Sequence, residues 1–307
     1  MAPLEVGFIG LGAIGSPLAE RLIEAGFELT AFDVVPDAVA RLVAKGARAA
    51  QTPAAVASAA EVVFASLPTP DICREVALGK EGVVAGDRIK VYVETSTAGA
   101  ATMQAIATGL AGRGIAMLDA PVSGGAAGVR SGHLAVMASG SAEALDRARP
   151  ALDAITDRLF VVGEVPGQGQ IVKVANQLLN ITNITVACEA VVMAIKAGLD
   201  PAIVLKVINV SSGRNSATEA LIADEMLSGS FRGGARLDIM HKDISLAVAE
   251  TNRLKAASLV GSVVQQVWTL ASNEDGNQDF TNIYRYFEKW AGLSEAPAPA
   301  KNKKPAA

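Results

Sequence analysis

Short apolar runs alternate with Ala-rich segments of helical spacing through the first half of the chain. The runs predict strands at residues 4–9, 28–32, 62–67, 91–94, 116–118, 134–138 and 159–162. The segments between them predict helices, including 71–78, 100–113 and 143–155. Strands that alternate with helices in this way are typical of a parallel sheet covered on both faces. We therefore expect an α/β fold whose first domain, residues 1–164, is a Rossmann-type, mostly parallel sheet.

The pattern changes after residue 164, where apolar residues continue at helical spacing and no further strand is indicated. One uninterrupted stretch from Gln170 to Gly198 predicts a helix of about 28 residues, well above the usual length. The same spacing continues at 201–209, 217–226, 239–253 and 258–272. We expect an all-helical domain for substrate binding and oligomerisation over residues 165–293, joined to the first by the long helix. Residues 294–307, rich in Pro, Ala and Lys, are expected to form a disordered tail.

A glycine-rich loop follows the first predicted strand and precedes a helical stretch. It comprises Gly10, Leu11, Gly12, Ala13, Ile14 and Gly15. In this G-x-G-x-x-G spacing the first glycine permits a tight turn, the second lets backbone amides approach a pyrophosphate, and the third lets the helix pack on the strand. The helix N-terminus then faces the anion. These six residues are therefore predicted to bind a dinucleotide cofactor.

Asp33 follows the second predicted strand, at the position where an acid binds the adenosine ribose in such domains. A carboxylate there would repel a 2'-phosphate, and the next residues, Val34 to Pro36, supply no arginine to attract one. The sequence therefore predicts NAD, with NADP less favoured. The alternative is that Asp33 only ends a strand before a helix that starts at Pro36.

Charge and composition exclude several classes of partner. The 307 residues carry a net charge of −4, and no basic stripe of the kind that binds nucleic acid is present. No apolar stretch reaches membrane-spanning length without interruption, so we expect no membrane partner. The two cysteines are far apart and there are two histidines, so we expect no metal site and a reducing, cytoplasmic location.

Polar side chains recur at spacings of three and four along the predicted long helix. They are Lys173, Asn176, Gln177, Asn180 and Asn183. A lone cation on an otherwise apolar helix must be paired, solvated in a cleft or shifted toward neutrality. Desolvation, or a second cation such as Lys242, would lower the pKa of Lys173 toward the range of acid–base catalysis. The alternative is that Lys173 extends to solvent at a helix end.

A second glycine-rich segment, D-A-P-V-S-G-G at residues 119–125, follows another predicted strand. Ser123 and the amides of Gly124 and Gly125 could bind a carboxylate, since several N–H groups in a small loop form an anion nest. A flexible turn is the alternative.

Another dehydrogenase design can be tested by spacing. None of the three tyrosines is followed by a lysine four residues on, which excludes the short-chain dehydrogenase mechanism.

Four separated motifs together resemble the β-hydroxyacid dehydrogenase family, which contains 3-hydroxyisobutyrate dehydrogenase and tartronate semialdehyde reductase (2-hydroxy-3-oxopropionate reductase). They are the glycine loop, the D-A-P-V-S-G-G segment, G-x-G-x-x-x-K-x-x-N-Q at 167–177 and K-D at 242–243. The resemblance covers residues 4 to about 292. It implies an oxidoreductase that transfers a hydride between a nicotinamide cofactor and a small carboxylate-bearing 3-hydroxy acid or its semialdehyde.

The same resemblance implies a role for each matching residue. Lys173 would be the catalytic acid–base, and Ser123, Gly124, Gly125, Asn176 and Gln177 would bind or support the substrate. The cofactor would lie against Leu67, Pro68, Thr97 and Lys242. Gln177 departs from the usual pattern, which has a second asparagine there, so its longer amide would contact the substrate from a shifted position. The resemblance implies that members similar to tartronate semialdehyde reductase tolerate this glutamine.

Two other functions stay open from the sequence. Imine reductases share the scaffold but usually replace the lysine, and a non-catalytic NAD-binding relative would be expected to have lost it. The presence of Lys173 disfavours both. The long apolar helix presents more surface than one small domain covers, so a homodimer or homotetramer is expected.

Overall fold

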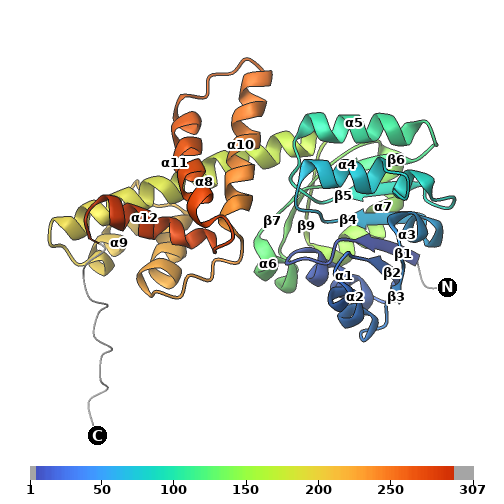
Figure 1. Ribbon diagram of the computed structural model, residues 1–307, viewed down its shortest axis with the longest axis horizontal. Coiled ribbons are helices and arrows are strands. Elements are labelled where there is room, and N and C mark those ends of the chain that lie inside the picture. The colour runs from blue at the N-terminus through green and yellow to red at the C-terminus, as the bar shows by residue number, and fades with distance from the viewer. Residues whose placement is uncertain (1–4, 294–307) are drawn as a thin grey trace, which may run out of the picture. The chain divides into compact units, whose positions relative to one another are not determined.

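The computed structural model describes residues 5–293, which divide into two compact units (Figure 1). One unit holds the residues up to Leu179 together with Lys242–Ser262. The other holds Asn180–His241 and the residues from Val263 on. The tail expected at 294–307 lies outside the described residues.

A nine-stranded sheet forms the centre of the first unit, in the order β3-β2-β1-β4-β5-β6-β8-β7, with β9 also paired to β8. The strands are β1 Glu5–Ile9, β2 Glu28–Phe32, β3 Arg48–Ala49, β4 Val62–Ala65, β5 Val91–Glu94, β6 Ala116–Asp119, β7 Val122–Ser123, β8 Ala135–Ser139 and β9 Arg158–Gly163. All pairs from β3 to β6, and β8 with β9, are parallel, whereas β8 is antiparallel to β6 and β7. The expected Rossmann-type, mostly parallel sheet is confirmed.

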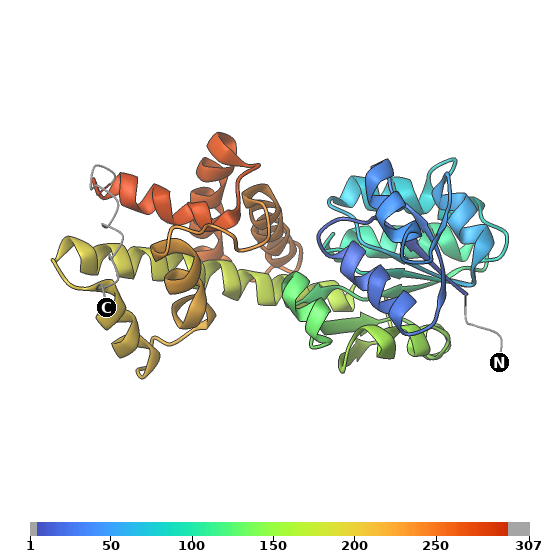
Figure 2. The ribbon, with the colours of Figure 1, turned by 90° about the horizontal axis from the view of Figure 1, so that it is seen from below.

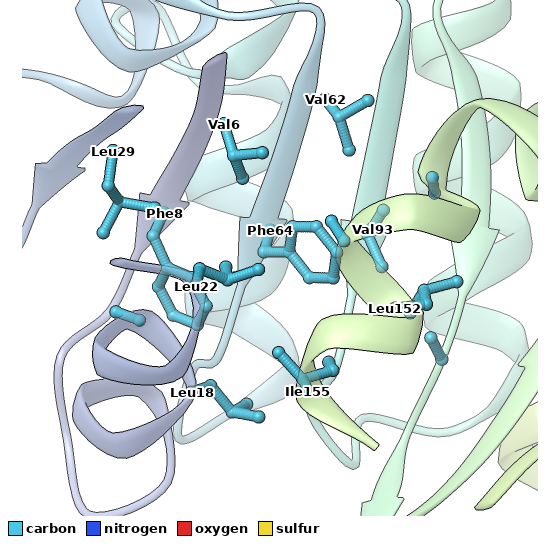
Figure 3. Close-up of a cluster of buried hydrophobic side chains, with 14 of the residues drawn as sticks. Val6, Phe8, Leu18, Leu22, Leu29, Val62, Phe64, Val93, Leu152 and Ile155 are labelled. Carbon is cyan, nitrogen blue, oxygen red and sulfur yellow. The ribbon is translucent and has the colours of Figure 1, made fainter. Parts of the chain in front are cut away.

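Helices cover both faces of this sheet, as Figures 1 and 2 show from two sides. They are α1 Gly15–Glu24, α2 Pro36–Val43, α3 Pro53–Ala59, α4 Pro70–Leu78, α5 Ala100–Ala111, α6 Gly125–Ser131, α7 Ala142–Ile155 and the short 3-10 helix η1 Val83–Ala85. Since neighbouring residues of a strand point to opposite faces, each strand contributes to two cores. Phe8 and Phe64 pack against Leu22 of α1 and Ile155 of α7 (Figure 3), whereas Tyr92 lies in the core formed with α3, α4 and α5.

From Gln168 on, the described chain is helical, which confirms the all-helical second half. The elements are α8 Gln168–Lys196, α9 Pro201–Asn209, the π-helix η2 Ala217–Leu227, α10 Leu237–Arg253, α11 Leu259–Asp275, the 3-10 helix η3 Phe280–Asn282 and α12 Ile283–Trp290. Within this part of the described chain, β-pairing is limited to one isolated bridge between Arg236 and Asp279. At 29 residues, α8 agrees with the length expected for the long helix.

Some details differ from the sequence-based expectations. The strand expected at 62–67 is shorter in the structure, since β4 ends at Ala65. Beyond it, the Leu67 N–H donates to the Ser96 hydroxyl and not to a neighbouring strand. Helix α3, capped by Thr52, was not predicted, since seven residues are too few to show periodicity.

The expectation that no stretch could span a membrane is corrected, because α8 meets that criterion by length and composition. The core helix of a soluble protein meets it equally.

Candidate active site

The glycine loop joins β1 to α1 where the strand order reverses, since β1 lies between β2 and β4. Gly10 has a φ of +88°, and a Cβ on it would lie 2.3 Å from the Ser66 carbonyl oxygen. A Cβ on Gly15 would lie 1.9 Å from the Gly10 carbonyl oxygen, whereas a Cβ on Gly12 would meet nothing within 4 Å. Packing within the protein therefore requires Gly10 and Gly15, and Gly12 leaves open the side on which a pyrophosphate would bind. Helix α1 has no side-chain cap and no acid in its first turn, so no negative side chain there competes with an anion for the positive end of its dipole.

Asp33 is held beside this loop by two backbone amides. The Leu11 N–H donates to its Oδ2 at 2.5 Å and the Val35 N–H to its Oδ1 at 2.7 Å. The residue that follows Asp33, Val34, is 84% exposed, and no cationic side chain stands there. The carboxylate and the open loop together fit the adenosine ribose and pyrophosphate of a dinucleotide.

Lys173 lies near the start of α8, and its side chain is only 6% exposed. Among residues 5–293, its ammonium makes no hydrogen bond. Burial lowers the pKa of Lys173, the negative charge of Asp243 opposes this shift, and the positive charge of Lys242 adds to it. The result is a lysine that loses its proton more easily than a solvated one.

Asp243 is the centre of a buried polar network beside Lys173. Its Oδ1 accepts a hydrogen bond from Lys242 Nζ at 2.7 Å, and its Oδ2 accepts one from Gln177 Nε2 at 2.6 Å. Lys242 Nζ also donates to the Thr97 carbonyl at 2.5 Å. The network therefore joins α8 and α10 to the loop after β5.

The loop after β6 contains the predicted carboxylate-binding residues. Gly124 and Gly125 have φ values of +131° and +60°, which favour glycine and leave their amides uncovered by side chains. Asn176 Nδ2 lies 3.4 Å from Ser123 Oγ and 3.4 Å from Gln177 Oε1. Ser123, Asn176, Gln177, Asp243, Lys242 and Thr97 thus form one continuous chain of polar contacts.

Glu94, at the end of β5, is a buried carboxyl that sequence reasoning missed. It accepts hydrogen bonds from the Tyr92 hydroxyl at 2.8 Å, the Ser96 hydroxyl at 2.5 Å and the Ser96 N–H at 3.1 Å. Burial raises the pKa of Glu94 to about 7 in spite of these bonds. Ser96 in turn accepts from the Leu67 N–H, so Glu94 orders the loops that carry the predicted cofactor contacts Leu67, Pro68 and Thr97.

Asp119, the register partner of Glu94 on β6, was assigned no role from the sequence. It accepts hydrogen bonds from the Gln170 side chain at 2.7 Å and from the backbone N–H groups of Gly167 and Gln170. Gln170 Oε1 also accepts from the Ala98 N–H at 2.9 Å. The start of α8, one turn before Lys173, is thereby tied to the sheet. The sequence signals that could have indicated this contact were an acid at the end of a strand and a glutamine three residues before Lys173.

Glu94 should make the stability of the protein depend on pH. An unfolded glutamate releases its proton near pH 4.5, whereas folded Glu94 retains it to about pH 7, so the folded state loses stability as the pH rises between these values. The expected loss is on the order of 3 kcal/mol. Urea unfolding from pH 4.5 to 8 should show this decline together with one from Asp119, whose pKa burial raises to about 6, and Glu94→Gln should remove the share of Glu94 while exposed Glu81→Gln should not. An unchanged slope in Glu94→Gln would contradict the assignment.

Comparison with known proteins gives consistent matches over nearly the whole chain. Residues 5–163 match the model for the NAD-binding domain of 6-phosphogluconate dehydrogenase, and residues 167–287 match the model for the NAD-binding region of NADP-dependent 3-hydroxyisobutyrate dehydrogenase. The chain is 33% identical to 2-(hydroxymethyl)glutarate dehydrogenase of Eubacterium barkeri, over 95% of this chain and 97% of that protein. It is 34% identical to an NAD-dependent L-serine dehydrogenase of Pseudomonas aeruginosa, over 94% and 99%.

The chain belongs to the β-hydroxyacid dehydrogenase family. Among solved structures, 3-hydroxyisobutyrate dehydrogenase from Salmonella typhimurium superposes with a TM-score of 0.83 at 30% identity, covering 92% of this chain and 99% of that one. Imine reductases also match, but more distantly, with a Streptomyces aurantiacus enzyme at a TM-score of 0.63 and 25% identity. As a member of this family, the protein is a nicotinamide-dependent oxidoreductase that acts on the hydroxyl group of small hydroxy acids.

Proposed function

We propose that this β-hydroxyacid dehydrogenase uses Lys173 as its acid–base group and interconverts a short 3-hydroxy acid and its semialdehyde with NAD. The observation that carries the proposal is Lys173, a residue only 6% exposed whose ammonium makes no hydrogen bond within the described chain. A buried ammonium without a partner is costly unless a ligand completes its surroundings. The carbonyl or hydroxyl oxygen of a substrate would supply that missing partner.

The proposed chemistry follows from the residues around Lys173. A bound nicotinamide would give or accept the hydride at the substrate carbon. In reduction, Lys173 would donate a proton to the carbonyl oxygen, where negative charge develops in the transition state. In oxidation, the neutral amine would take the hydroxyl proton. Ser123, with the amides of Gly124 and Gly125 and with Asn176 in support, would hold the carboxylate of the substrate.

The choice of NAD rests on Asp33 and its neighbours. The carboxylate is fixed by two amides, where it would accept hydrogen bonds from the ribose hydroxyls and repel a 2'-phosphate. Gly10 to Gly15 would hold the pyrophosphate, while Leu67, Pro68, Thr97 and Lys242 would line the nicotinamide half. In this proposal residues 1–164 form the dinucleotide-binding domain and residues 165–293 the substrate and oligomerisation domain.

A panel of small aldehydes tests the proposed function. Purified protein should oxidise NADH with tartronate semialdehyde or methylmalonate semialdehyde, whose products are 3-hydroxy acids, faster than with succinate semialdehyde or glyoxylate, whose products are 4- and 2-hydroxy acids. It should not turn over a cyclic imine. Turnover of the imine alone would favour the imine reductase alternative. NADH binding without turnover of any compound would favour a non-catalytic role.

We also propose that the protein is a homodimer or homotetramer in the cytoplasm. Val172, Leu179, Val186 and Met193 recur every seven residues along α8 and are 41% to 69% exposed. A seam of apolar side chains at this spacing is typical of helices that pack on another helix. Packing against a second copy of the chain would bury this seam.

The proposed location rests on the cysteines. Both of them, Cys73 and Cys188, are buried free thiols, as a reducing compartment allows.

The seam on α8 makes the oligomeric state testable. The double substitution Leu179→Glu and Val186→Glu should shift the protein toward monomer in sedimentation velocity at micromolar concentration, because it places charges in the interface. Val43→Glu, which alters an exposed apolar residue on α2, should leave the assembly unchanged. A wild-type protein that sediments only as monomer would rule out the proposed oligomer.

A further inference from the structure

Gln177 stands where the family usually has asparagine, and its surroundings suggest a use for the extra length. Its side chain is 7% exposed, and both ends of its amide contact the protein. Nε2 donates to Asp243 Oδ2 at 2.6 Å, and Oε1 lies 3.4 Å from Asn176 Nδ2. We propose that Gln177 is a positioning residue, which holds the Asp243 carboxylate beside Lys173 instead of binding the substrate. This inference rests on the proposed role of Lys173.

The length of the side chain decides whether this contact exists. Asparagine is one carbon shorter, so its amide would end about 1.5 Å short of the present position of Nε2. Added to a contact of 2.6 Å, this shortfall exceeds the range of a hydrogen bond. Asp243 would then keep only its bond to Lys242 among these contacts, and the carboxylate oxygen that Gln177 now holds would no longer be fixed.

The charges around Lys173 give the loss of this contact a chemical effect. The groups whose charges act on Lys173 are Asp243, which favours its ammonium form, and Lys242, which disfavours it. The buried carboxyls of the neighbouring strands, Glu94 and Asp119, are held by Ser96 and Gln170 respectively. Losing the bond from Gln177 would weaken the favourable contribution of Asp243 and leave burial and Lys242 in place. The pKa of Lys173 should therefore fall further.

The test compares pH profiles of kcat/KM for aldehyde reduction in wild type and Gln177→Asn, with an active aldehyde from the panel. Reduction needs protonated Lys173, so the alkaline limb should move to lower pH by about 0.5 to 1 unit. At a pH above the pKa of Lys173 in both proteins, kcat/KM of the variant should be lower than that of wild type by about 3- to 10-fold, with KM changed less than about twofold. Exposed Gln104→Asn on α5 is the matched control and should match wild type.

Two further variants distinguish the positioning role of Gln177 from a folding defect or an indirect effect. Gln177→Met keeps the length but cannot donate, and it should reproduce the shift of Gln177→Asn. In an Asp243→Asn background, Gln177→Asn should add no further shift, because the carboxylate that it positions is absent. Thermal melting and NADH binding identify any variant that has lost its fold.

The outcomes separate this inference from the proposed function. A raised KM with an unmoved pH limb would show that Gln177 binds substrate and would overturn the positioning role. Equal and additive effects of Gln177→Asn with and without Asp243 would overturn it as well. If Lys173→Met kept wild-type turnover, the acid–base proposal itself would fail, whatever Gln177→Asn does.

Discussion

Replacing Lys173 with methionine should lower kcat/KM for aldehyde reduction by about 10²- to 10⁴-fold, the usual contribution of a positioned general acid. Methionine fills a similar volume but cannot donate a proton or stabilise charge on the substrate oxygen. NADH binding should change little, because the glycine loop and Asp33 lie in a different part of the same unit. Steady-state kinetics and NADH fluorescence measure the two quantities separately.

The stability of Lys173→Met makes this prediction sharper. Lys173 is 6% exposed and its ammonium lacks a hydrogen bond in the described chain, so removing the charge should leave the melting temperature unchanged or raise it. Loss of activity without loss of stability would identify a group retained for chemistry. Lys206→Met, at an exposed position on α9, is the matched control. A Lys173→Met protein within about threefold of wild type would contradict the proposed mechanism.

Cofactor preference should reverse when Asp33 is replaced by alanine and Val34 by arginine. Wild type should prefer NADH because Asp33 binds the ribose hydroxyls and repels a 2'-phosphate. Loss of charged hydrogen bonds of about 1.5–3 kcal/mol should reduce kcat/KM with NADH by roughly 10- to 100-fold. The introduced guanidinium would pair with the 2'-phosphate of NADPH, so kcat/KM with NADPH should rise by a similar factor.

The matched controls for cofactor preference are the two single variants. Asp33→Ala should lose activity with NADH and gain only modestly with NADPH, whereas Val34→Arg should retain NADH use. Equal wild-type kcat/KM values for NADH and NADPH would disprove the assigned preference.

The parts of the site that depend on local sequence were predictable. Gly10 and Gly15 are required by the backbone turn that they form themselves, so their spacing predicts the geometry of the loop. Asp33 lies at the end of β2, and its contact with the Leu11 amide follows from the pairing of β1 and β2. The length of α8 was also predictable, because an unbroken apolar stretch contains no residue that would end a helix.

The polar network around Lys173 was not predictable in the same way. Gln177 and Asp243 are 66 positions apart, and periodicity places Gln177 on the face of Lys173 without showing what lies opposite. The bond between Gln170 and Asp119 spans 51 positions and depends on how α8 starts against the sheet. Burial of Glu94 likewise depends on the packing of helices on both faces of β5. Such contacts follow from the fold, which spacing along one chain does not specify.

The most direct test of the central claim is to follow a label from NADH to the product. With NADH deuterated at the transferable position of the nicotinamide ring, the hydroxy acid formed from an active semialdehyde should carry deuterium on its carbinol carbon, as NMR or mass spectrometry would show. Formation should become slow in Lys173→Met, with the label in the same place. A product without deuterium at that carbon, or equal rates in both proteins, would contradict lysine-assisted hydride transfer.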